Sequence, residues 1–132
     1  MPNDTSPTED YTPDAARIAA QNDAFRRAVT TCPPGIPMPE GLRGRVVFTQ
    51  AVAARGLPFQ LQCLLEIAAI TAFEPENDPE GWHDFGAIEV RGERVWFKLD
   101  LYSDERMEWG SDRPDDPSLT YRVMTVLFPS DW

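Results

Sequence analysis

The chain has 132 residues, of which 22 are acidic and 12 are Lys or Arg, for a formal net charge of −10. This balance argues against direct binding to nucleic acid, because that binding depends on Lys and Arg neutralising phosphates. No apolar run is long enough to cross a bilayer, and the N-terminus lacks the basic-then-apolar order of a secretory leader. We therefore expect a cytoplasmic protein without membrane contact.

The first predicted element is a helix. Residues 1–12 are polar and offer almost nothing to bury, so we expect a disordered tail followed by one domain over residues 13–132. Thr12 is the expected N-cap, with Pro13 at the first helical position, and the helix should continue to about Val29.

The middle of the chain predicts a loop, a strand and a second helix. The stretch TCPPGIPMPEGLRG has too many prolines and glycines for regular structure. Residues Arg45 to Thr49 predict a buried strand. Residues Pro58 to Phe73 are apolar around most of a helical circumference, which predicts a core helix packed on several sides. Glu74-Pro75 should end that helix.

The C-terminal half predicts strands. Phe85–Val90 and Val95–Tyr102 flank RGER, which is typical of a hairpin, and an acidic loop at 103–118 follows. The last run, TYRVMTVLF, is apolar on both faces and should lie in the centre of a sheet. This order predicts an α+β domain with a mostly antiparallel sheet of about four strands packed against one core helix.

Negative charge is concentrated in residues 74–118, which carry fourteen acids and five bases. Such a block favours a non-enzymatic binding protein that engages a basic protein surface. Tryptophan is enriched at the centres of protein interfaces, so the two tryptophans of the acidic loops are candidate anchors. The candidate partner-binding residues are Trp82, Asp104, Glu105, Glu108, Trp109, Asp112, Asp115 and Asp116.

The chain's one histidine lies in the run NDPEGWHDFG and allows two interpretations. The first is a turn built by Asn, Asp, Pro and Gly, in which His83 hydrogen-bonds to Asp84 or to a backbone carbonyl. The second is a metal-dependent hydrolase or ligand-binding site made by Asp78, His83, Asp84 and Asp100. A single histidine excludes two-histidine metal motifs such as HExxH, and the turn is the interpretation that we favour.

Signatures of other chemistry are missing from the sequence. There is no GxSxG elbow, no glycine-rich phosphate loop, and no CxxC spacing, and the two cysteines stand in unrelated segments. We therefore expect no cofactor, and a binding protein rather than an enzyme.

The segments NDPEGWHDFG, VWFKLDLY and DRPDDPSLTYRVMTVLF together resemble an uncharacterised family of small acidic bacterial proteins, a domain of unknown function often found on plasmids and other mobile elements. The likeness extends over residues 14–128. The resemblance implies a mobile-element setting, in which the basic partner would be a nucleic-acid-binding host protein such as a restriction or CRISPR effector. Asp and Glu would then stand in for DNA phosphates. A third hypothesis is an assembly or scaffold subunit that uses its sheet edge.

Overall fold

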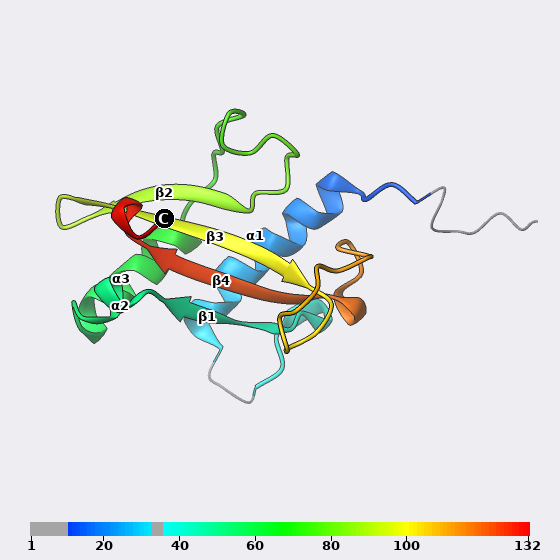
Figure 1. Cartoon of the computed structure of the whole chain (residues 1–132), viewed down its shortest axis with the longest axis horizontal. Helices are drawn as coiled ribbons and strands as arrows, with labels where there is room; N and C mark the ends of the chain where they lie inside the picture. Colours follow the sequence, from blue (N-terminus) through cyan, green and yellow to red (C-terminus); the bar gives the residue numbers. More distant parts are fainter. Residues whose placement is uncertain (1–10, 33–35) are drawn as a thin grey trace, which may run out of the picture.

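The structure, a computed structural model, describes residues 11–32 and 36–132. Most of the expected tail, residues 1–10, lies outside the described residues. The fold is α+β, with helices behind one face of an open sheet (Figure 1). The longer elements are α1 (Ala15–Thr31), β1 (Gly44–Phe48), α2 (Gln50–Ala53), α3 (Leu57–Ala68), β2 (Phe85–Val90), β3 (Glu93–Tyr102) and β4 (Tyr121–Leu127). Single 3-10 turns are η2 (Pro39–Gly41), η3 (Pro117–Leu119) and η4 (Pro129–Asp131).

The sheet has four strands in the order β1-β4-β3-β2. Strand β4 pairs with β3 in antiparallel and with β1 in parallel, and β3 pairs with β2 through the hairpin. The sheet is therefore mixed, with two antiparallel pairs and one parallel pair. The prediction that the last strand is central is confirmed, because β4 lies between β1 and β3.

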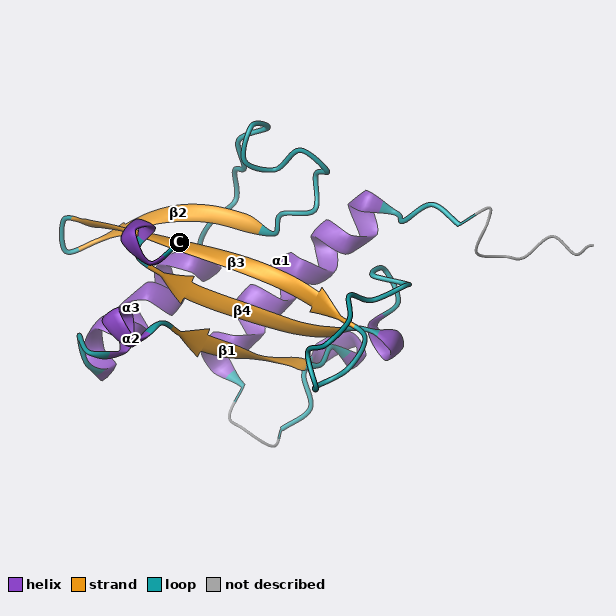
Figure 2. Cartoon of the chain, in the orientation of Figure 1, coloured by secondary structure: helices purple, strands orange, loops and turns teal. Residues whose placement is uncertain are grey.

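The core lies between the sheet and two helices. Figure 2 shows α1 and α3 side by side behind the strands. The buried core side chains include Phe25, Phe59, Cys63, Ile67, Val95, Phe97, Leu99, Met124 and Val126. Those of β3 and β4 recur at every second position, as expected when alternate residues point to one face. No helix in the described ranges has the length and apolar character needed to cross a membrane.

The start of α1 differs from the prediction. The N-cap is Asp14, whose carboxylate accepts a 3.1 Å hydrogen bond from the Arg17 N–H, and not Thr12. A carboxylate in this position satisfies one of the free N–H groups of the first turn. Tyr11, expected in the tail, donates a 2.6 Å hydrogen bond from its hydroxyl to Asp115. This contact ties Tyr11 to the acidic loop.

The prediction for α3 was wrong in two respects. The helix ends at Ala68, five residues before Phe73, and it is not covered on several sides. Leu57 is 77% exposed and Leu61 is 52% exposed, while the opposite face carries the buried residue Cys63. The prediction of burial rested on the apolar character of leucine alone. Strand β1, however, is an edge strand, and among the described residues no further element lies beyond it.

The two edge strands also differ from the predictions in detail. Strand β1 was expected to be buried, yet Arg45 and Val47 are exposed. The hairpin turn is shorter than RGER, because Arg91 and Gly92 alone form it, with φ of 52° and 81°. Two successive residues with positive φ suit the right-handed twist of the flanking strands.

Candidate functional site

The histidine motif forms the last part of the segment between α3 and β2. The His83 N–H donates a 3.0 Å hydrogen bond to Asp78, which is buried, and the Trp82 carbonyl accepts a 2.9 Å hydrogen bond from Asn22 of α1. His83 has φ of 58°. A non-glycine residue in the left-handed region is uncommon and is retained only where surrounding contacts fix it. The turn predicted from the sequence is therefore present and is attached to α1.

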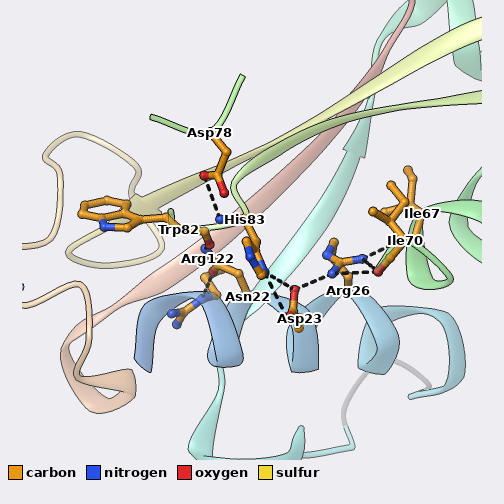
Figure 3. A network of polar contacts seen from close by, with 9 residues as sticks. All are labelled: Asn22, Asp23, Arg26, Ile67, Ile70, Asp78, Trp82, His83 and Arg122. Atoms are coloured by element: carbon orange, nitrogen blue, oxygen red, sulfur yellow. Dashed lines mark hydrogen bonds and ion pairs between the residues drawn. The ribbon is translucent and has the colours of Figure 1, made fainter. Parts of the chain in front are cut away.

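The imidazole of His83 contacts a residue that the sequence did not suggest. Its Nδ1 lies 3.0 Å and 3.1 Å from the two carboxylate oxygens of Asp23 (Figure 3). The prediction that His83 bonds to Asp84 or to a backbone carbonyl was wrong, because α1 passes directly beside this turn. Asp23 itself is half-buried on α1. A distant pairing of this kind leaves no local signal in the sequence.

Arg26 lies one helical turn after Asp23 and is fully buried. Its guanidinium forms an ion pair with Asp23 and donates to the Ile67 carbonyl at 2.6 Å, at the end of α3. It also lies 5.1 Å from the ring centre of Phe73, on which the His83 ring stacks at 4.1 Å. Burial lowers the pKa of Arg26. The Asp23 carboxylate therefore contacts both the guanidinium of Arg26 and the imidazole of His83.

This network connects α1 with the end of α3 and with the segment before β2. A carboxylate on Nδ1 fixes the ring orientation, as in catalytic dyads. However, among residues 11–32 and 36–132 no three His, Cys, Asp or Glu side chains converge to hold a metal ion. Of the residues in the alternative hypothesis, Asp78 binds the His83 amide and Asp100 pairs with Lys98 at 3.2 Å. The contacts therefore describe a tie between α1 and the segment before β2.

The pKa of Asp84 reflects its burial and the negative charges around it. Burial, followed by the charges of Asp78, Glu80 and Asp100, raises the pKa of Asp84 to about 6. Its backbone carbonyl accepts a 2.8 Å hydrogen bond from Leu99, which holds the residue beside β3. The carboxylates of the histidine motif and Asp100 of β3 therefore share one region of negative potential.

The eight candidate partner-binding residues divide into two groups. Four have internal roles or are covered. Asp115 is buried and accepts from Tyr11 and from the Asp14 N–H, Asp116 caps η3, and Asp104 binds Arg106 at 2.9 Å. Trp82 is half-buried. The exposed members are Glu105, Glu108, Trp109 and Asp112.

The exposed residues share one structured loop, residues 103–112, which we call the Trp109 loop. The Ser103 N–H donates a 2.8 Å hydrogen bond to the Trp109 carbonyl, and Tyr102 forms a bridge with Gly110, so the base of the loop is closed. Within the loop, Met107 N–H donates to Asp104 at 3.1 Å. The Trp109 side chain is 74% exposed. The loop therefore presents a large aromatic side chain from an ordered backbone.

Arg122 is a second buried arginine that sequence reasoning missed. It projects from the central strand toward α1, where Nε donates to Asn22 at 2.7 Å and Nη2 donates to Gln21 at 2.8 Å. Burial lowers its pKa to about 10. The only sequence signal was an arginine within an otherwise apolar strand.

Comparisons with known proteins give one family. The model of a protein family of unknown function, DUF3768, matches residues 48–131. The match includes the histidine motif, the Trp109 loop and β4, and leaves α1 outside. No curated protein and no solved structure matches the chain.

Proposed function

The chain belongs to DUF3768, a family of proteins of unknown function, and we propose that it is a non-enzymatic binding protein that engages a basic protein surface through the Trp109 loop. One observation carries this proposal. The Trp109 side chain is 74% exposed on a loop whose backbone closes on itself. A tryptophan held in water by an ordered loop buries a large apolar area when a partner covers it.

The loop geometry favours binding energetically. Tryptophan is enriched among the few interface residues that supply most of the binding energy. Because hydrogen bonds at the base of the loop already restrict its backbone, less conformational entropy is lost on association. Three exposed carboxylates, those of Glu105, Glu108 and Asp112, lie in the same loop and would attract a basic surface.

The charge of the loop indicates the class of partner. Residues 103–112 carry four acids and one arginine, so the loop has a net negative charge. A nucleic-acid-binding protein presents the complementary surface, because its binding face is rich in Lys and Arg. The exposed carboxylates would then occupy the place of phosphates, as in an anti-restriction or anti-CRISPR inhibitor. The mobile-element setting implied by the resemblance supports this partner class.

The test is a binding titration at two salt concentrations. Purified restriction endonucleases and a CRISPR effector nuclease serve as probes, with affinity measured by calorimetry. We expect at least one probe to bind, and to bind more weakly as salt rises, because the contact is between exposed charges. The variant Trp109→Ala should reduce that affinity by at least about tenfold. No binding by any probe, or affinity independent of ionic strength, would contradict the proposal.

Two matched controls separate the loop from general effects. Trp132 is also 74% exposed but lies outside the Trp109 loop, so Trp132→Ala should leave affinity unchanged. Neutralising the three loop carboxylates together should weaken binding, whereas neutralising three exposed acids elsewhere should weaken it far less. The control acids are Glu40, Glu66 and Glu89.

A further inference from the structure

Among residues 11–32 and 36–132, no backbone partner takes the outward hydrogen-bonding groups of strand β1. The Arg43 carbonyl accepts from Arg122 and the Thr49 N–H donates to Val126, so the odd-numbered residues of this segment point their backbone groups toward β4. Alternation along a strand then directs the N–H and C=O groups of Gly44, Val46 and Phe48 outward. Figure 2 shows β1 as the last strand on its side of the described sheet. An open edge is a template for another strand.

An apolar groove runs beside this edge. It has a volume of about 540 Å³ and is lined by Phe48, Leu57, Pro58, Gln60, Leu61 and Leu64. The leucines at positions 57 and 61 are the exposed side chains that contradicted the prediction of a covered helix. An exposed apolar surface next to free backbone groups is characteristic of a protein interface.

We propose that this edge binds a second copy of the chain, with β1 pairing antiparallel to β1 of the partner about a twofold axis through Val46. In this register Val46 faces the partner's Val46, and Gly44 faces the partner's Phe48. These are the residues whose backbone groups point outward, and each such pair exchanges two N–H···O bonds. The twofold axis uses the same patch on both copies and therefore forms a closed dimer.

Charges that flank β1 favour a second copy in this orientation. Arg43, which is exposed, precedes the strand, and Thr49 follows it and donates a 2.7 Å hydrogen bond to Asp131. Antiparallel pairing about Val46 places Arg43 opposite the partner's Thr49, and hence near the partner's Asp131. The axis repeats this cation–carboxylate contact at both ends of the strand. The one charged residue within β1, Arg45, lies opposite the partner's Val47 and is a diagonal neighbour of the partner's Arg45, the one like-charge contact of this register.

The position of β1 in the molecule also limits the electrostatic repulsion between two copies of this acidic chain. Residues 36–73, which contain β1 and α3, carry three arginines and two glutamates. The Trp109 loop, in which four acids outnumber one arginine, lies at the end of the sheet opposite α2 and α3 (Figure 1). The inferred dimer leaves the Trp109 loop outside the pairing strands, so it does not depend on the proposed function.

Sedimentation equilibrium of the full chain tests the dimer. We expect a dimer mass in the micromolar range, and a shift to the monomer with Leu61→Glu, which adds charge to the groove. Ala20→Glu is the matched control, because Ala20 is exposed on α1 and the substitution adds the same charge. A wild-type chain that is monomeric up to millimolar concentration, or a dimer unaffected by Leu61→Glu, would overturn the inference.

Two further measurements test the register. Arg43→Glu should weaken the dimer by at least about tenfold, and Arg43→Glu combined with Asp131→Arg should restore it by reversing the ion pair. The amides of Val46 and Phe48 should exchange more slowly as protein concentration rises, because they become paired. Failure of the double variant to recover any affinity, together with exchange independent of concentration, would exclude this pairing. A result of this kind would favour an extended peptide of another protein as the occupant.

Discussion

Nε of Arg122 donates a 2.7 Å hydrogen bond to Oδ1 of Asn22, and this contact joins the centre of the sheet to α1 inside the protein. Gln21 and the Pro114 carbonyl accept from another nitrogen of the same guanidinium. The described residues provide no partner for the third nitrogen, Nη1. The Arg122 cation is therefore held in the core by neutral amide and carbonyl groups. Removing some of these contacts should lower the free energy of unfolding.

Substitution of Arg122 tests this arrangement. Arg122→Lys should lower the free energy of unfolding by about 2–4 kcal/mol, because an ammonium cannot reach both amides and remains buried and poorly paired. Arg122→Met should cost less than the lysine variant, since it removes the buried charge while keeping similar volume. Urea denaturation with equal m-values measures both. A lysine variant as stable as the wild type would show that the amide contacts contribute little.

The contact between His83 and Asp23 should stabilise the segment before β2. His83→Ala removes the hydrogen bonds to Asp23 and the stacking on Phe73. We expect this variant to lower the free energy of unfolding by about 1–3 kcal/mol. Hydrogen exchange should accelerate over residues 71–84 more than in the hairpin.

Glycine at the same position separates the side chain from the backbone. Because His83 has φ of 58°, His83→Gly should be more stable than His83→Ala by about 1 kcal/mol. If the alanine variant were the more stable of the two, the left-handed backbone at this residue would not be a constraint.

Asp84 should make the protein less stable as pH rises. Its folded pKa of about 6 lies above the ordinary value of 3.8, so the folded state favours the protonated carboxyl. The unfolding free energy should therefore be highest, with respect to this group, below about pH 4 and should fall as pH rises to about 6. At about pH 8 Asp84→Asn should be more stable than the wild type by about 2 kcal/mol, and near pH 4 the two should agree. A difference that does not vary with pH would contradict this account.

Gly44 should not tolerate a side chain. A Cβ built there would lie 2.0 Å from the Arg122 carbonyl oxygen and 2.7 Å from the Phe25 ring. Gly44→Ala should therefore force β1 away from β4 and cost about 3 kcal/mol or more. Gly92→Ala is the control, because a Cβ at Gly92 meets nothing within 4 Å and incurs only the strain of φ at 81°, about 1–2 kcal/mol. Thermal denaturation compares the two variants, and equal losses would show that the contact at Gly44 can relax.

Much of the candidate site could be located from the sequence, but its contacts could not. The run NDPEGWHDFG predicted a turn, because Asn, Asp, Pro and Gly have local backbone preferences that do not depend on the rest of the fold. The residues of the 103–116 region were identified as a charged group. Their separation into exposed members, such as Trp109, and internal ones, such as Asp115, depends on Tyr11 and Asp14, about a hundred residues away. No local pattern records such a contact.

The sequence by itself determined the α+β class, the hairpin, the central place of β4 and the location of the acidic block, because periodicity, turn residues and charge are local properties of the chain. Only the tertiary structure decided that Asp23 receives His83, that Arg26 and Arg122 are buried, and that the leucines of α3 are exposed at an open edge. The physical reason is that burial depends on which element covers a residue. An arginine can be buried where amide and carbonyl oxygens accept hydrogen bonds from its guanidinium. A leucine stays exposed to solvent where no further element covers it.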